Sequence, residues 1–392
     1  MSERKVKILL IGGGSGGHVL PLLAVAEELR KLHQKLDLRV WCDKKTFGLV
    51  QELFVNLTDV KVERVAAGKL RRYHHLKWWQ HLQPAILWPN FKDIFRIIGG
   101  FCQSFAKLLV WRPAVIFCKG GYVGLPVGLV GALLRIKLII HDSDTLPGLT
   151  NRILSRFARK IATGFPVENY PTYAPAKLQY TSIPIKASFR PISPDKQVAL
   201  KRQLGFAADQ PLVLAVGGGL GAVAINDAIL TLAQTSPELQ LVLATGEFDL
   251  PRVEQEMSSA KITNLRAKSF FTDIDQYILS ADIVICRAGA TTLVELASAQ
   301  KLTIVVPNPK LSGGHQLKNA ENLANIKAVD VILEPELKND ATILQDTIHK
   351  LLTIGEKERQ TRLRAFASIV QPDASRQIAQ LIIGEIENAR TR

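Results

Sequence analysis

A glycine-rich stretch near the start of the chain, IGGGSGGHVLP (Ile11–Pro21), lies between two different residue patterns. An apolar run of strand length, Val6–Ile11, precedes it, and a run with helical period follows it. Glycines at such a joint let a ligand approach the backbone, and the helix beyond them offers unpaired N–H groups and the positive end of a dipole. The chemistry that this arrangement predicts is binding of phosphate or stabilisation of developing negative charge.

His18 stands at the start of the predicted helix, where an imidazole that titrates near neutral pH could act as a general base. The alternative is a histidine that only hydrogen-bonds the loop. The spacing of Gly12, Gly14 and Gly17 also satisfies the dinucleotide fingerprint, and Asp43 is a loose candidate for its acidic residue. A nicotinamide-dependent dehydrogenase is therefore one of the possible functions.

Length and composition predict the general class of the protein. The 392 residues suggest two domains, and 47% hydrophobic with 22% charged residues is typical of a globular protein. The four cysteines are far apart and form no CxxC pair, which indicates reduced thiols in a cytosolic setting. The sequence suggests no metal site, no cofactor, no signal peptide and no apolar run of about 18 to 20 residues that would span a bilayer.

The net charge of +15 favours an anionic partner. The segment Lys69–Trp111 concentrates basic residues and holds four of the five tryptophans of the chain. Cations and aromatic residues on a helix are typical of a contact with an anionic membrane surface. An ordinary crossover helix and an RNA-binding surface are the alternatives, but no recognised nucleic-acid module is present, so we expect no nucleic-acid partner.

Strand-like apolar runs alternate with helical patterns along both halves of the chain, which predicts doubly wound parallel sheets. In such sheets ligands bind beyond the carboxyl ends of the strands. The predicted strands are Val6–Ile11, Leu38–Cys42, Val60–Val65, Ala114–Cys118, Lys137–His141, Lys160–Phe165, Leu212–Val216, Leu239–Ala244, Ile262–Ser269, Ile283–Cys286, Leu302–Val306 and Ala328–Leu333.

A proline-rich stretch divides the two halves. It predicts a first domain over 1–165, a linker over 166–194 that carries six prolines, and a second domain over 195–372. The segment 373–392 has apolar residues in helical register and is expected to close back on the first domain.

Three motifs of the second half fall where strands end. They are GGGLGA (Gly217–Ala222), RAGATTLVEL (Arg287–Leu296) and GGHQLKNAENL (Gly313–Leu323). Backbone N–H groups at a helix start could hold a diphosphate, and a carboxylate one turn later, at Glu295, could accept ribose hydroxyls. A plain first-turn acid and a polar helix cap are the alternatives for individual residues. Together the motifs favour a nucleotide-sugar site.

The glycine-rich stretch near the start of the chain and the three motifs of the second half together resemble the MurG-type glycosyltransferases. The likeness also covers KGGYVGLP (Lys119–Pro126) and PGLTNRILSRFARKIATGFP (Pro147–Pro166), so it extends over nearly the whole chain. The resemblance implies a GT-B fold, in which two Rossmann-like doubly wound parallel-sheet domains face a cleft. It also implies inverting transfer of N-acetylglucosamine from UDP-GlcNAc to the muramyl 4-hydroxyl of the undecaprenyl-linked acceptor lipid I, which yields lipid II for peptidoglycan.

The resemblance assigns residues to each substrate by position. The implied donor residues are Thr291 and Thr292 at the diphosphate, Glu295 at the ribose, Phe270 or Phe271 at uracil, and Gln316 and Asn319 at the sugar. The loop and helix-start patterns add Gly219 and Ala290 as backbone donors to the diphosphate, and His315 as a further candidate for the sugar hydroxyls. The implied acceptor residues are Ser15, Gly16, Gly17, His18, Tyr122, His141, Asn151 and Lys186. The base would be His18, with Asp142 or Asp144 as alternatives, and Lys69–Trp111 would bind the cytoplasmic face of the membrane as a peripheral patch.

The chain departs from the family pattern at three places. The usual HEQN is HDSD (His141–Asp144), the glycine loop has Gly219 and Leu220 where serine and glutamine are usual, and Lys186 replaces an arginine. Lysine does not grip a planar or phosphate group bidentately as arginine does. These changes suggest a divergent member, and they leave open an enzyme with another lipid acceptor such as a diacylglycerol, or a non-catalytic membrane scaffold.

Overall fold

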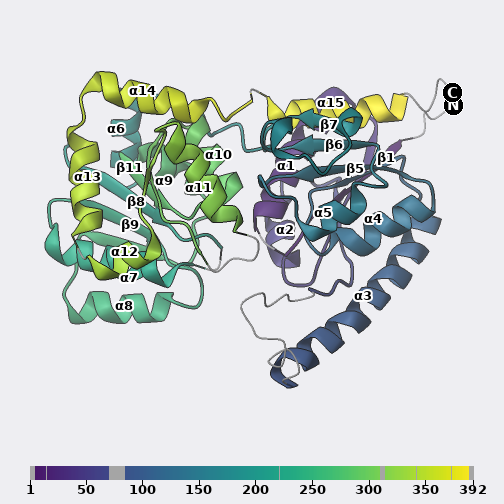
Figure 1. The fold of residues 1–392 in the computed structure, drawn as a ribbon, viewed down its shortest axis with the longest axis horizontal. Coiled ribbons are helices and arrows are strands. Elements are labelled where there is room, and N and C mark those ends of the chain that lie inside the picture. The colour runs from purple at the N-terminus through teal and green to yellow at the C-terminus, as the bar shows by residue number, and fades with distance from the viewer. Residues whose placement is uncertain are drawn as a thin grey trace. The chain divides into compact units, whose positions relative to one another are not determined.

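The computed structural model describes residues 5–14, 16–69, 84–219, 221–309, 314–340, 342–371 and 373–387. The chain forms two units: Met1–Lys186 together with Gln371–Arg392, and Ala187–Val370. Each unit is built on one parallel sheet with helices between its strands (Figure 1).

The first sheet has seven strands in the order β3-β2-β1-β4-β5-β6-β7. Its strands are β1 (Val6–Ile11), β2 (Leu36–Cys42), β3 (Lys61–Arg64), β4 (Val115–Cys118), β5 (Lys137–Asp142), β6 (Lys160–Thr163) and β7 (Leu178–Tyr180). Its helices are α1 (Gly16–Leu32), α2 (Phe47–Leu53), α3 (Pro84–Val110), α4 (Gly124–Leu133), α5 (Leu149–Leu154) and α15 (Ala374–Glu387). The chain order reverses between β1 and β4, which is where ligands bind in sheets of this kind.

The second sheet has six strands in the order β10-β9-β8-β11-β12-β13. Its strands are β8 (Leu212–Val216), β9 (Gln240–Ala244), β10 (Leu265–Lys268), β11 (Ile283–Cys286), β12 (Leu302–Val305) and β13 (Asp330–Val331). Its helices are α6 (Pro194–Gln203), α7 (Val223–Thr235), α8 (Leu250–Ser259), α9 (Ile274–Ser280), α10 (Ala290–Ser298), α11 (His315–Asn325), α12 (Glu334–Asn339), α13 (Ile343–Thr353) and α14 (Glu356–Ala367). The order reverses between β8 and β11, so the two units repeat one plan.

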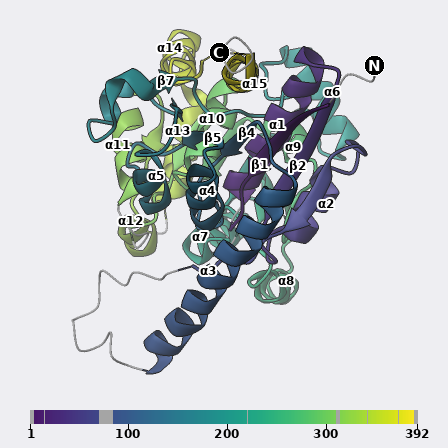
Figure 2. The ribbon, with the colours of Figure 1, turned by 90° about the vertical axis from the view of Figure 1, so that its right-hand side faces the viewer.

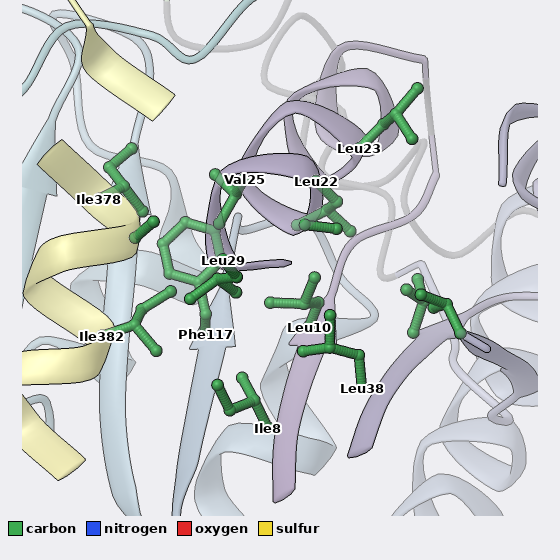
Figure 3. Packing of buried hydrophobic residues seen from close by; sticks show 14 of the residues in the cluster. Ile8, Leu10, Leu22, Leu23, Val25, Leu29, Leu38, Phe117, Ile378 and Ile382 are labelled. Carbon is green, nitrogen blue, oxygen red and sulfur yellow. The ribbon is translucent and has the colours of Figure 1, made fainter. Parts of the chain in front are cut away.

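The core of the first unit joins the two ends of the chain. Leu22, Val25 and Leu29 of α1 pack over β1 and β4, and Ile378 and Ile382 of α15 lie in the same buried cluster (Figure 3). Burying a side chain of this size contributes roughly 1.5–3 kcal/mol, so α15 anchors the C-terminal segment to the unit that begins the chain. This packing holds the start of α1, and the glycine loop before it, against the sheet.

The stretch predicted as a linker, 166–194, carries more structure than its prolines suggest. It contains two short 3-10 turns, Val167–Asn169 and Pro175–Lys177, and the edge strand β7, which pairs with β6. The first unit therefore continues through Lys186, beyond the predicted boundary.

Helix α3 is long and only partly covered. It packs against α4, and its N-terminal half projects beyond the rest of its unit in both ribbon views (Figures 1 and 2). Large apolar side chains recur along its open face at helical spacing: Trp88, Phe91, Ile94, Phe95, Ile98, Phe105 and Leu109. Within the described ranges, no helix is both long and apolar enough to span a bilayer. Residues 70–83 of the predicted basic segment lie outside the described part.

Candidate functional site

Two glycine segments meet at the carboxyl edge of the first sheet. The ends of β1 and β4 lie side by side, with Ile11 opposite Cys118, so the loops that follow them are neighbours. Gly121 has a φ of +76°, and a Cβ there would lie 2.8 Å from the Gly13 carbonyl oxygen and 3.6 Å from the His18 ring. Glycine is therefore required for the two loops and the imidazole to pack this closely.

His18 lies in the first turn of α1, next to these glycines, and is half-buried. Burial, followed by the positive charges of Lys119 and Lys69, lowers the pKa of its imidazole to about 4. The positive end of the α1 dipole acts in the same direction. His18 is therefore neutral at neutral pH, which is the state that a proton acceptor requires.

Asp43 holds the first glycine loop in place. Its carboxylate accepts hydrogen bonds from the Gly14 amide (3.0 Å), the Tyr122 hydroxyl (2.7 Å), the Thr46 hydroxyl (2.5 Å) and the Lys45 amide (3.2 Å). Burial opposes the charged form, but these hydrogen bonds outweigh it and lower the pKa of Asp43. Since its oxygens are engaged with the loop, Asp43 does not present the free carboxylate that a dinucleotide ribose needs. The structure thus does not favour the dehydrogenase interpretation.

The HDSD segment places its residues at different depths. His141 is completely buried, and its Nε2 donates to the Ser182 carbonyl at 2.9 Å. Asp142 is buried and accepts a hydrogen bond from the Tyr173 hydroxyl at 2.7 Å. Both side chains are therefore held within the first unit by hydrogen bonds to its own residues.

The burial of Asp142 also changes its protonation. Burial raises the pKa of Asp142 to about 7, against the opposing hydrogen bond from Tyr173. Asp142 is 4% exposed and its Oδ2 is engaged by Tyr173, so His18 and Asp144 are the more open candidates for the base. Asp144 is half-buried beyond the strand end and keeps its place as the alternative to His18.

The remaining predicted acceptor residues support the loops or flank them. Asn151 is buried and donates from Nδ2 to the His141 carbonyl at 3.0 Å, directly beneath Gly120. Tyr122 lies with its ring against Gly14. Gly16 and Gly17 open α1, and Lys186 is half-buried at the end of the first unit. Ser15 lies outside the described residues.

The carboxyl edge of the second sheet brings its three motifs together. Val216, Cys286 and Val305 lie in one row of the ladder, so the loops after β8, β11 and β12 leave the sheet side by side. Gly221 has a φ of +76°, and a Cβ there would lie 2.0 Å from the Thr245 carbonyl oxygen. The glycine loop that contains Gly219 is thus packed tightly on the neighbouring strand end.

Helix α10 begins at this edge. Ala290 is buried, whereas Thr291 and Thr292 are half-buried in its first turn, where the backbone N–H groups have no acceptor within the helix. Glu295 lies one turn later, and after burial its charge is the second cause of a raised pKa of the Cys286 thiol. A helix start followed by a carboxylate suits a diphosphate and the polyol attached to it.

Helix α11 is tied to the same edge by two amide side chains. The Asn319 Nδ2 donates to the Ala288 carbonyl at 3.1 Å, and the Gln316 Oε1 accepts from the Asn308 amide at 2.8 Å. His315 stands at the helix start, and its buried Nδ1 has no hydrogen-bond partner in the described structure. These bonds tie α11 to the loop before α10 and to the loop after β12.

Of the two candidate phenylalanines after β10, only one is open. Phe270 is 50% exposed, whereas Phe271 is buried with its ring 4.5 Å from that of Tyr277. Phe271 therefore belongs to the core, and Phe270 is the ring that could stack on a base. No group of three metal-binding side chains occurs in the described ranges.

Sequence reasoning missed the residues that hold the first site together. Asp43 was considered only as part of a dinucleotide fingerprint, and Lys119, Ser143 and Tyr173 were not singled out. Lys119 is 1% exposed at the end of β4. Its position directly before two glycines, after an apolar strand, was the signal that could have found it.

The two units match two family models: the glycosyltransferase family 28 N-terminal domain over residues 8–163 and its C-terminal domain over residues 212–378. A curated relative from Caldicellulosiruptor saccharolyticus, named UDP-N-acetylglucosamine–N-acetylmuramyl-(pentapeptide) pyrophosphoryl-undecaprenol N-acetylglucosamine transferase, is 31% identical over 97% of this chain and 98% of its own. A relative of the same name from Borreliella afzelii is 30% identical over 100% of both chains.

Among solved structures, MurG from Acinetobacter baumannii is similar in fold, with a TM-score of 0.66 and 23% identity over 97% of this chain and 99% of its own. The chain is therefore a member of glycosyltransferase family 28, within the group of N-acetylglucosamine transferases that these relatives represent.

Proposed function

We propose that this glycosyltransferase transfers N-acetylglucosamine from UDP-GlcNAc to the muramyl 4-hydroxyl of lipid I, with inversion at the anomeric carbon. The observation that carries the proposal is the identity of about 30%, over the full length, to transferases of that name. Both units also keep a glycine loop at the point where strand order reverses.

The second unit binds the donor. Backbone N–H groups at the start of α10, with Thr291 and Thr292, hold the diphosphate, and Glu295 accepts the ribose hydroxyls. Phe270 stacks on uracil, while His315, Gln316 and Asn319 line the sugar subsite. As the bond between the anomeric carbon and the diphosphate oxygen breaks, these N–H groups stabilise the negative charge of the leaving UDP.

The first unit binds the acceptor and supplies the base. The 4-hydroxyl oxygen attacks the anomeric carbon, its proton passes to neutral His18, and the bonding electrons leave with UDP. The first turn of α1, with Gly16 and Gly17, and the partly buried Lys186 suit the charged diphosphate of the acceptor. Asn151 and His141 act by holding the loops around His18.

A parallel assay of acceptors tests the choice of substrate. The protein is incubated with labelled UDP-GlcNAc and either lipid I or a diacylglycerol, each in the same detergent. We expect transfer to lipid I alone. Transfer to the diacylglycerol would replace the acceptor in this account, and donor binding without transfer to either lipid would favour a scaffold.

A matched pair of histidine variants tests the base. His18→Ala should lower kcat by about 100-fold or more, since a positioned base contributes that much. The control is His349→Ala, because His349 is an exposed histidine of α13 in the other unit. A His18 variant that turns over as fast as the control would remove His18 from the mechanism and direct attention to Asp144.

We also propose that α3 binds the anionic cytoplasmic face of the membrane. Three aromatic rings of α3 form a cluster: the Phe91 ring centroid lies 6.0 Å from that of Trp88 and 4.9 Å from that of Phe95. The Phe95 side chain is 59% exposed. The Lys92 ammonium lies 5.0 Å from the Trp88 ring. Exposed rings with cations beside them are typical of a helix that lies in the lipid interface.

Flotation with liposomes tests this surface. Phe91→Ser together with Phe95→Ser should release the protein from anionic vesicles, and high salt should weaken the binding of the unaltered chain. Phe248→Ser is the control, because Phe248 is 83% exposed in the other unit. Equal binding of all variants, or equal binding to neutral vesicles, would contradict a role for α3 and its charges.

A further inference from the structure

Lys119 is a buried cation at the centre of the first site. It follows β4 directly, is 1% exposed, and donates from Nζ to the Ser143 hydroxyl. Two other buried lysines have conventional partners: Lys201 pairs with Asp282 at 2.6 Å, and Lys301 donates to two backbone carbonyls at 2.6 and 3.0 Å. Burying an ammonium costs free energy, so one held by a hydroxyl in a substrate site calls for a functional reason.

The hydrogen bonds around Lys119 run in one direction. The ammonium can only donate, so the Ser143 oxygen accepts from it. The Ser143 hydroxyl hydrogen is then free to donate to the His141 Nδ1, which lies 3.4 Å away. The His141 Nε2 lies 2.9 Å from the Ser182 carbonyl oxygen, which can only accept. This chain fixes a single neutral tautomer of His141.

The charge of Lys119 also acts on the imidazole of His18. Lys119 leads into Gly120 and Gly121, and Gly121 is the residue that lies against the His18 ring. The groups that act electrostatically on His18 or Lys119 come from several elements. They are Lys69 before α3, Cys118 on β4, His141 and Asp142 on β5, and Asp144 after it. Burial is the largest cause of the lowered pKa of His18, and the charge of Lys119 is the second largest.

We propose that Lys119 is a positioning residue that keeps His18 in its neutral, proton-accepting form and locks His141 in one tautomer through Ser143. Protonation of His141 would require the Ser143 hydroxyl to turn its hydrogen toward an ammonium that cannot accept it. Protonation of His18 would add a second positive charge where the charge of Lys119 already acts against it. The role in catalysis rests on the proposed function, whereas the effect on the two imidazoles does not.

Lys119 is positively charged over the pH range in which it would act on His18. Burial lowers the pKa of Lys119 to about 8, with Asp144 and Asp142 acting in the opposite direction, so it stays protonated throughout the acidic range in which His18 titrates. Removing the ammonium therefore raises the pKa of His18 toward its ordinary value. An active form that needs neutral His18 would then lose activity at a higher pH than the unaltered enzyme does.

The test is a titration of histidine rings by NMR on the full chain with 13C- and 15N-labelled histidine, in which His18→Gln assigns the signal. Lys119→Met removes the charge and keeps the length, and should raise the His18 pKa by about one pH unit. Lys301→Met is the control for loss of a buried lysine, because Lys301 lies in the other unit, and it should leave His18 unchanged. Lys69→Met, at an exposed position, should give a smaller rise.

The acidic limb of kcat/KM with lipid I should move upward by the same amount in Lys119→Met. A folded Lys119→Met protein with the His18 titration of the unaltered chain would overturn the proposal, even if turnover fell. Should Lys119→Met not fold, Ser143→Ala decides, because it removes the donor to the His141 Nδ1 and should change the 15N shifts of that ring. Unchanged shifts would overturn the proposal. If no variant or unaltered chain turns over lipid I, the proposed function fails while the ring titrations still decide the role of Lys119.

Discussion

Substitution of Gly121 by alanine tests the packing that brings the two glycine loops of the first unit together. An alanine at φ +76° costs about 1 kcal/mol relative to glycine, and its Cβ would lie 2.8 Å from the Gly13 carbonyl oxygen. That contact is with backbone, which yields only by moving the loop, and adds about 1 kcal/mol more. The total loss of unfolding free energy should be about 2 kcal/mol.

Tryptophan fluorescence in urea measures this loss selectively. All five tryptophans, Trp41 to Trp111, lie in the first unit. With an m value of about 3 kcal/mol/M, the urea midpoint of this unit should fall by about 0.7 M. Turnover should fall by about tenfold or more, because a shift of the loop displaces the His18 ring that contacts it.

A second glycine gives the opposite sign in the same assay. Gly384 lies within α15, where a Cβ meets nothing within 4 Å, so alanine should raise the midpoint by about 0.2–0.3 M, from roughly 0.5–1 kcal/mol of helix propensity. If Gly121→Ala matched the unaltered chain in both midpoint and turnover, the two loops would not be packed as closely as described.

Three further predictions concern pH, uracil stacking and the α11 tie. Burial raises the pKa of Asp142 to about 7 in the folded state, so its contribution to stability is fully present below its unfolded pKa near 4 and is lost as the pH rises through 7. Asp142→Asn should therefore raise the urea midpoint more at pH 8 than at pH 5. An equal change at both pH values would contradict the burial of that carboxyl. Phe270→Ala should raise the KM for UDP-GlcNAc about tenfold with little change in stability, whereas Phe271→Ala should destabilise by about 3 kcal/mol; the reverse pattern in kinetics and unfolding would exchange their roles. Asn319→Ala should raise the same KM by about tenfold because α11 loses its bond to the Ala288 carbonyl, and donor titrations that match the unaltered chain would exclude that tie.

The strands were largely predictable because most are buried on both faces and read as continuous apolar runs. Val6–Ile11, Leu212–Val216 and Ile283–Cys286 were predicted to the residue. Other ends differ by one to three residues, as for Lys160–Phe165, which ends at Thr163 as a strand. The apolar run shows which residues are buried, whereas the end of a strand is set by the last hydrogen bond to its neighbour. The two do not always coincide.

The short edge strand β7 was missed for a related reason. Leu178–Tyr180 is half-buried, follows two prolines and has three residues, so it carries too little apolar pattern to be distinguished from a linker. Its place in the sheet depends on pairing with β6, which is a tertiary contact.

The two site regions were predictable from glycine-rich joints at strand ends, which any parallel sheet gathers at one edge. The hydrogen bonds that hold those regions were not predictable. Tyr122 reaches Asp43 across 79 positions of sequence, and Lys119 reaches Ser143 across 24. Side chains so far apart meet only because β1, β2, β4 and β5 are neighbours in the sheet, which local patterns do not specify.

The transfer reaction can be tested by isolating its product. Purified protein is incubated with lipid I and UDP-GlcNAc, and the product is isolated and its new glycosidic linkage determined by NMR. We expect lipid II with one added N-acetylglucosamine on the muramyl 4-hydroxyl, inverted relative to the donor, and loss of this product in His18→Ala. A product with retained configuration, or none from a folded protein that binds UDP-GlcNAc, would contradict this expectation.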